Sequence, residues 1–210
     1  MFRNLFRPDS PLMITIAQIT DCIFLSLFWL LGCFPVVTIG ASMAALYDAT
    51  YRTFRKGEKH SWQRFAHVYR ENWKQSILPT VIFLALMTVL VRCGILLWNN
   101  AVYGNISWGM FSGLGFVLLL PLGMGCILFP LLSRFETGTM QLFSNAFRLG
   151  FVNLPRTLAL ALVNGVTALL CIRFVFPLFF LPALSALMGS LFLEPMFRPY
   201  MPEEDPQDAA

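Results

Sequence analysis

The sequence predicts an all-α membrane protein: a polytopic transmembrane helical bundle of about six spans, with amphipathic interfacial helices on the cytoplasmic side. Of its 210 residues, 57% are hydrophobic and only 12% are charged, whereas a soluble domain carries about 25% charged residues. The mean hydropathy is +0.68. Several apolar runs also approach or exceed the ~18–20 residues that cross a hydrocarbon core. These features indicate a single integral membrane domain over residues 1–198.

The apolar runs locate the individual spans. We expect them at about residues 14–35, 36–54, 77–98, 109–132, 157–173 and 177–195. The first follows two arginines, as a signal peptide does, but it lacks a small-residue cleavage site and is therefore expected to be retained. The last apolar region is too long for one span at 1.5 Å per residue, and Arg173 and Pro177 divide it. The acidic tail, 199–210, is expected to be disordered.

The second span decides the topology. If residues 36–54 cross the membrane, all 15 Lys and Arg residues except Arg92 and Arg173 lie on the same side as both termini. The positive-inside rule makes that side cytoplasmic. If residues 36–54 stay on one side, the basic segment 52–74 lies opposite the basic N-terminus and the asymmetry is lost. Six spans are therefore preferred, and five spans with a re-entrant or interfacial second helix are the alternative.

Small residues dominate this second helix. After an outer turn that starts at Pro35, Gly40, Ala44 and Asp48 recur at intervals of four residues, beside a parallel strip of alanines. Small residues at this spacing let membrane helices approach closely. Asp48 and Arg52 are also four residues apart, which favours an ion pair near the cytoplasmic end. A functional acid at Asp48 is the alternative.

A basic and aromatic segment follows. Trp62, Phe65, Tyr69 and Trp73 share one helical face, basic residues occupy the others, and Ser61 is the expected N-cap. This pattern predicts an amphipathic helix in the headgroup region, with its basic residues against anionic lipid. A helix that docks onto a partner protein would have the same composition.

A later segment repeats this pattern. The identical pairs are Glu58 with Glu136, Gln63 with Gln141, Phe65 with Phe143, and Arg70 with Arg148. Each copy lies between two predicted spans, which suggests a duplicated unit of helix, surface helix and helix, as some transporters have. Chance similarity is the alternative, because the chain contains 21 phenylalanines.

The fourth span contains prolines and glycines. Pro121, Gly123 and Gly125 could break the helix and expose backbone groups to a small neutral solute. The alternative is a kinked span that packs closely at its glycines, because both residue types are common in membrane helices.

Residues for catalysis, cofactors or metals are not indicated. The two histidines, His60 and His67, lie in a basic surface segment without a well-placed third ligand. The five cysteines form no CxxC pair, and no P-loop, nucleophile elbow or HExxH motif is present. Asp21 and Asp48 fall near the predicted cytoplasmic ends of their spans, which argues against an ion pump. We therefore expect no enzyme, no cofactor and, at a net charge of +4, no nucleic-acid partner.

The chain from about residue 20 to residue 76 resembles the YesL-like family of bacterial membrane proteins, whose function is unknown. The resemblance lies in the Pro-x-x-Thr-x-Gly-Ala-Ser turn at 35–42, the Ala-Leu-Tyr step at 45–47, Gly57-Glu58 and the segment 65–75. Asp21 matches a position that is often acidic in that family. The resemblance implies a bacterial inner-membrane protein encoded near carbohydrate uptake systems. We therefore expect an accessory or regulatory component that binds a transporter subunit or a second copy of itself; a small neutral-solute transporter or channel is the alternative.

Overall fold

The computed structural model describes residues 11–58, 60–104, 108–134, 138–174, 176–197 and 199; the side chains of 11–14, 108, 110–112 and 114–120 are not described. The helices are α1 (Pro11–Cys33), α2 (Ile39–Tyr51), α3 (Ser61–Val102), α4 (Trp108–Arg134), α5 (Thr139–Val152), α6 (Leu154–Arg173) and α7 (Leu181–Phe197). Short helical turns η2 (Val36–Thr38), η3 (Arg52–Lys56) and η4 (Phe176–Phe179) connect some of them. The described residues contain no strand, which confirms the all-α class. The tail predicted to be disordered, except residue 199, lies outside the described residues, as does Glu136.

In the described part of the chain, three helices are long and apolar enough to cross a membrane. They are α1 over Thr15–Cys33, α3 and α6. The described C-terminal part of α4, Pro121–Arg134, and α7 are also apolar but shorter. These lengths and compositions fit a membrane protein, whereas the count of six spans stays a prediction.

The predicted second span forms a short central helix. α2 has 13 residues, about 20 Å at 1.5 Å per residue, and it continues from η2 into η3. Nearly all of its residues from Gly40 to Thr50 are buried. A Cβ atom on Gly40 would collide with the side chains of Thr80 in α3 and Phe129 in α4. The predicted close packing at small residues is therefore confirmed.

The predicted surface helix and third span are one helix, which differs from the sequence-based expectation. α3 runs for 42 residues and contains Pro79 without ending there. The aromatic face is also divided, because Phe65 is buried while Trp62 and Trp73 are exposed. Phe65 packs 6.0 Å from Phe28 of α1, centroid to centroid. The start of α3 thus packs on α1 and α2 and continues into the third span without a break, whereas its contact with the headgroup layer stays a prediction.

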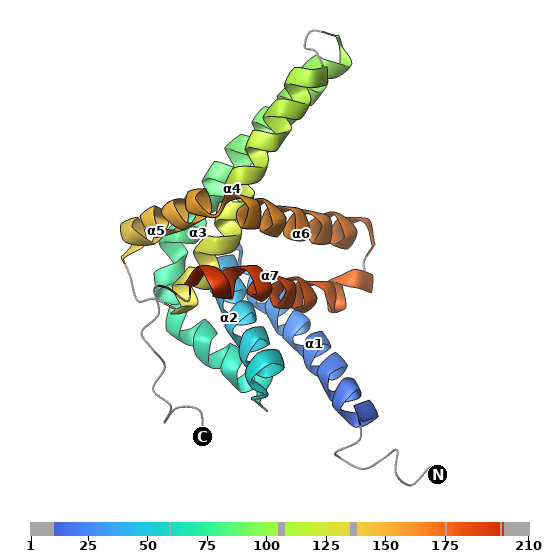
Figure 1. The fold of residues 1–210 in the computed structure, drawn as a ribbon, viewed down its shortest axis with the longest axis vertical. Coiled ribbons are helices and arrows are strands. Elements are labelled where there is room, and N and C mark those ends of the chain that lie inside the picture. The colour runs from blue at the N-terminus through green and yellow to red at the C-terminus, as the bar shows by residue number, and fades with distance from the viewer. Residues whose placement is uncertain are drawn as a thin grey trace.

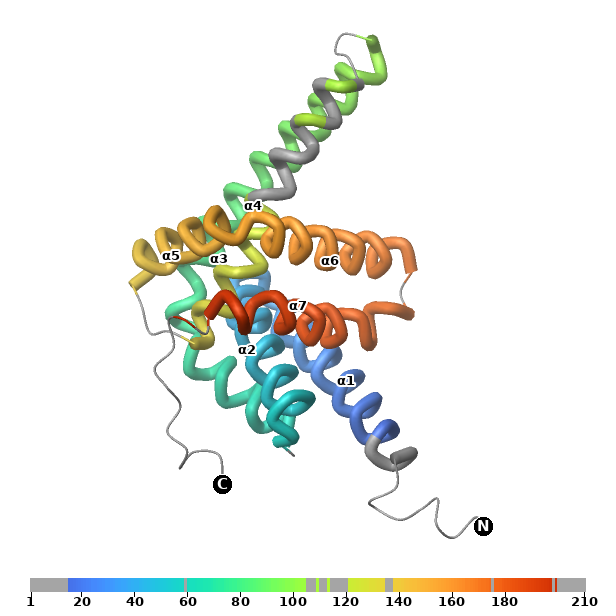
Figure 2. Tube along the Cα trace, viewed as in Figure 1, coloured from blue at the N-terminus to red at the C-terminus, as the bar shows by residue number. Residues whose placement is uncertain are grey.

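The second copy of the proposed repeat follows the same order of elements. The C-terminal part of α4 is buried from Ile127 to Leu132, as α2 is. α5 and α6 then run almost in line, separated at Asn153 (Figures 1 and 2). In the order of elements along the chain, α5 and α6 together correspond to the single long helix α3 of the first copy. Ala146 of α5 and its counterpart Val68 of α3 are both buried.

The end of α3 projects from the bundle. Figure 1 shows its C-terminal half extending beyond the other helices, beside the beginning of α4. Its large apolar side chains are exposed there, among them Val89, Val91, Ile95 and Leu96. An apolar surface of this kind suits contact with lipid or with another membrane helix.

Candidate functional site

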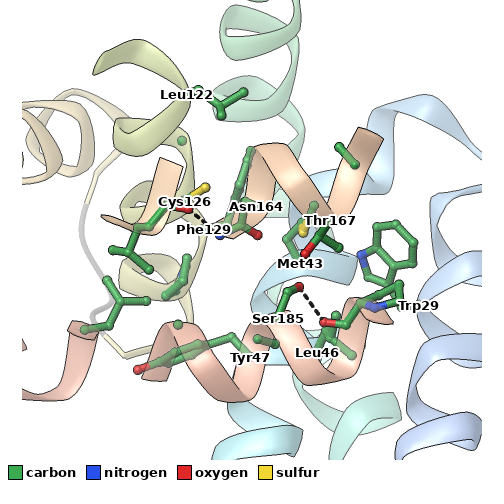
Figure 3. A pocket seen from close by; sticks show the side chains of 18 of the residues that line it. Trp29, Met43, Leu46, Tyr47, Leu122, Cys126, Phe129, Asn164, Thr167 and Ser185 are labelled. Atoms are coloured by element: carbon green, nitrogen blue, oxygen red, sulfur yellow. Dashed lines mark hydrogen bonds between the residues drawn. The ribbon is translucent and has the colours of Figure 1, made fainter. Parts of the chain in front are cut away.

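A cavity of about 270 Å³ lies among α1, α2, α3, α4, α6 and α7 (Figure 3). Most of its wall is apolar, with Leu46, Phe129 and Leu160 among the lining residues. Ala186 and Gly189 of α7 also line it. These two residues are small and leave space that larger side chains would fill. The cavity therefore depends on small residues on this face of α7.

Few polar groups line this cavity, and most have partners within the protein. Asn164 donates from Nδ2 to the carbonyl oxygen of Leu160 at 3.0 Å. Ser185 donates from Oγ to the carbonyl oxygen of Pro182 at 2.8 Å. The indole nitrogen of Trp29 is buried, and no described residue accepts a hydrogen bond from it. Figure 3 shows this nitrogen turned toward the part of the cavity where Met43 and Thr167 lie.

Tyr47 lies at the end of the cavity opposite Trp29 (Figure 3), and its hydroxyl contacts an ion pair outside the cavity wall. The Tyr47 hydroxyl donates to Glu194 Oε1 at 3.0 Å. Arg134 donates from Nη2 to the same oxygen at 2.9 Å, and its guanidinium stacks 4.6 Å from the ring centroid of Tyr51. Arg134 is 10% exposed and Glu194 is 17% exposed. These residues, called here the Glu194 cluster, join α2, α4 and α7.

A second ionic group, called here the Asp48 cluster, begins at the next residue of α2. The Asp48 side chain is 1% exposed and accepts from Arg52 Nε at 3.3 Å, which confirms the predicted pair. It also accepts from Arg64 Nε of α3 at 2.6 Å. Arg52 in turn donates to Glu58 at 3.1 Å. The ion pair predicted within one helix therefore also ties α2 to α3.

Asp21 links α1 to α3 through a hydrogen bond. Ser61 was expected to cap α3, but His60 is the residue before the helix, and no side chain caps it. Ser61 is the first helical residue, and its hydroxyl donates to Asp21 Oδ1 at 2.7 Å. The N-cap prediction was wrong because a tertiary partner in α1 takes this hydroxyl.

Pro35 lies in the turn where it was expected. The Thr38 hydroxyl donates to the carbonyl oxygen of Pro35 at 2.8 Å and to that of Gly32 at 2.8 Å. These bonds tie the first turn of η2 back to the end of α1. The motif that carries the family resemblance thus has a structural role at this turn.

The fourth span has no break at the residues where a solute path would need one. α4 stays helical from Trp108 to Arg134, through Pro121. A Cβ atom on Gly123 would lie 2.7 Å from the carbonyl oxygen of Thr157, so this glycine lets α4 approach α6. A Cβ atom on Gly125 would collide with the ring of Phe83 in α3. The alternative prediction of close packing at the glycines is therefore the correct one, although Gly125 also lines the cavity.

The remaining residues singled out in the sequence lie away from the cavity. Arg70 on α3 and Arg148 on α5 are exposed. His67 lies 3.4 Å from Glu71, and both side chains are 59% exposed. Among the residues that the structure describes, no three His, Cys, Asp or Glu side chains are grouped to hold a metal ion.

Sequence reasoning missed the Glu194 cluster. Arg134 was assigned to a cytoplasmic loop and Glu194, 60 positions later, to the end of the last span. The available signal was that Glu194 is an ionisable residue inside an apolar run, which predicts a buried partner. Local spacing cannot identify that partner, because it comes from a different helix.

Comparison with known proteins adds one similarity. A family model described as "Protein of unknown function, DUF624" matches residues 22–92. The matched segment runs from α1 through α2 and most of α3, so it includes the Asp48 cluster but neither Arg134 nor Glu194. The match is consistent with the resemblance of the N-terminal segment. No curated protein and no solved structure matches the chain.

Proposed function

We propose that the chain is a non-enzymatic accessory or regulatory component of the bacterial inner membrane, linked to carbohydrate uptake through binding to a transporter subunit. The observation that carries the proposal is the pairing of two carboxylates, the buried Asp48 and the partly buried Glu194, with arginines of other helices. Carboxylates held in this way join helices. Acids that serve proton or ion transport are usually placed along the path of the ion.

The link to carbohydrate uptake rests on the resemblance of residues 20–76. The apolar surface of the outer half of α3, with Val91 and Ile95, supplies area for a membrane-embedded partner. Helix association in a membrane relies on packing of this kind, because lipid offers no hydrophobic driving force between helices.

The test is purification of the tagged full chain from native membranes in mild detergent, followed by identification of chains that co-purify in constant ratio. We expect a transporter subunit. An unrelated polytopic protein carrying the same tag is the control. A monodisperse monomer without a partner would contradict the proposal. A stable homo-oligomer with no other chain would also contradict binding to a transporter, because the partner would then be a second copy of this chain.

Transport of a small neutral solute is the second candidate, favoured by the apolar cavity within the helical bundle. The wall argues against a sugar, because each unpaired hydroxyl in an apolar site costs about 1–3 kcal/mol. Uptake of neutral solutes into reconstituted vesicles tests this function. Transport through the cavity predicts a loss of uptake in Ala186→Phe, which fills it, and unchanged uptake in Ala85→Phe, an exposed position on α3.

Topology can be tested separately with reporter fusions. Six spans with cytoplasmic termini predict a cytoplasmic reporter at Gly57 and a periplasmic reporter at Asn100. Gly57 is exposed and has a φ of 72°, in the left-handed region, so it ends the α2–η3 segment at a turn where an insertion is tolerated. A periplasmic signal at Gly57 would contradict the six-span topology.

A further inference from the structure

The cavity has the size of a binding site for a small molecule. Its volume of about 270 Å³ is close to the lower end of ligand pockets, roughly 300–1,000 Å³. It also exceeds the ~150 Å³ engineered apolar cavity that binds benzene. A molecule with two small rings, or a short branched chain, is therefore of suitable size.

The polarity of the wall selects a mostly apolar molecule. Leu46, Phe83 and Phe129 contribute to it from three helices. Of the few polar side chains in the wall, Asn164 and Ser185 already donate to backbone carbonyls, and Thr167 adds one hydroxyl. A ligand with many hydroxyl or charged groups would lose more hydration than these few groups replace.

The absence of charge from the described wall also disfavours an ionised ligand. Glu194, which Tyr47 and Arg134 engage, does not line the cavity, and none of the lining residues carries a charged side chain. An ion would therefore lose its hydration without gaining a counter-charge. A neutral molecule avoids this cost.

The indole of Trp29 supplies one specific polar contact. Its nitrogen can only donate a hydrogen bond, and no described residue accepts one from it. The nitrogen has under 1 Å² of exposed surface, so an acceptor reaches it only after a wall side chain shifts slightly. Met43 lines the same cavity and has the flexible side chain for this movement. A single acceptor, such as a carbonyl oxygen, would complete the site.

The rim favours entry from the bilayer. Ala168 of α6 lines the cavity and is exposed. α6 is one of the three helices that are long and apolar enough to span a membrane. A ligand dissolved in lipid would therefore meet this rim directly.

We propose that this cavity binds a neutral, mostly apolar small molecule with one hydrogen-bond acceptor, which the indole N–H of Trp29 recognises. The molecule enters from the lipid beside α6. This inference is independent of the proposed partner, since it concerns a site within one chain.

Photolabelling of the full chain in lipid vesicles tests the site with isotopically labelled benzophenone, which has two rings and one carbonyl acceptor. Unlabelled benzophenone and the diphenyl alkene of the same shape, in which CH₂ replaces the oxygen, serve as competitors. We expect saturable labelling of cavity residues such as Met43. The alkene should need about two- to tenfold higher concentration to compete, as expected for one lost hydrogen bond.

Two variants separate the acceptor contact from the cavity itself. Trp29→Phe should make the two competitors equally effective, whereas Trp62→Phe, an exposed tryptophan outside the cavity, should preserve their difference. Ala186→Phe should reduce labelling at least tenfold, and Ala85→Phe should not. The Trp29→Phe result remains informative if Ala186→Phe fails to fold.

Labelling that does not saturate, or labelling only on outer helix faces, would overturn the cavity site. Equal competition in the native chain would overturn recognition by Trp29.

Discussion

The Asp48 and Glu194 clusters join α2 to the rest of the bundle in different ways. Asp48 is 1% exposed, but its two arginines, Arg52 and Arg64, are 29% and 28% exposed. In the Glu194 cluster both charged partners are largely buried, at 10% for Arg134 and 17% for Glu194. One cluster thus has cations with access to the surface, and the other does not.

This difference indicates how each cluster would respond to the loss of its acid. Arginines that are partly exposed can turn toward water or lipid headgroups when their carboxylate is removed. A buried arginine has no such route and keeps an uncompensated charge. Exposure of the cation, more than burial of the acid, should therefore set the order of the mutational effects.

The largest effect is expected for Glu194→Gln. It leaves Arg134 charged and buried, and its Nε already lacks a partner among the described residues. The free energy of unfolding should fall by about 4 kcal/mol, within the range for breaking a buried ion pair. Denaturant titration in mixed micelles measures it. The double variant Glu194→Gln, Arg134→Gln should lose less than the sum of the two single variants; simple additivity would mean that the pair does not interact.

A smaller loss is expected for Asp48→Asn. The two freed arginines are partly exposed, so the free energy of unfolding should fall by about 2–3 kcal/mol, less than for Glu194→Gln. The same titration measures it. If Asp48→Asn lowers the free energy of unfolding more than Glu194→Gln does, the loss is determined by burial of the acid and not by exposure of the arginine. Loss of a cellular phenotype without loss of stability would instead assign Asp48 a functional role.

Tyr47→Phe should cost about 1 kcal/mol in the same measurement. The change removes one hydrogen bond to Glu194 and leaves the Arg134 contact in place. Tyr51→Phe is the matched control, because the ring that stacks on Arg134 is retained. A loss as large as that of Glu194→Gln would mean that the hydroxyl holds the ion pair together.

The smallest effect is expected for Glu58→Gln. Its carboxylate is 42% exposed and contacts Arg52 from the surface. Exposed ion pairs contribute about 0–1 kcal/mol, so the free energy of unfolding should change by less than 1 kcal/mol. The effect should also vanish at high salt, because exposed charges are screened. A salt-independent loss would place Glu58 within the buried part of the Asp48 cluster.

The sequence alone predicted the features that depend on local spacing and composition. Apolar content indicated the membrane class, and small residues at intervals of four predicted that α2 would pack closely at Gly40. The Asp48–Arg52 pair followed from the same helical period. Each of these depends on residues within one helix, where side chains three and four positions apart share a face.

Only the tertiary structure decided which helices contribute to each site. Arg64 reaches Asp48 because α3 packs on α2, and Arg134 meets Glu194 because the C-terminal ends of α4 and α7 come together. The same packing keeps α3 and α4 helical through Pro79 and Pro121, where the local sequence allows a break. It also encloses the cavity, since an unfilled volume depends on the sizes of residues from several helices. Contacts between distant segments depend on how the helices cross, and hydrophobic periodicity does not specify those crossings.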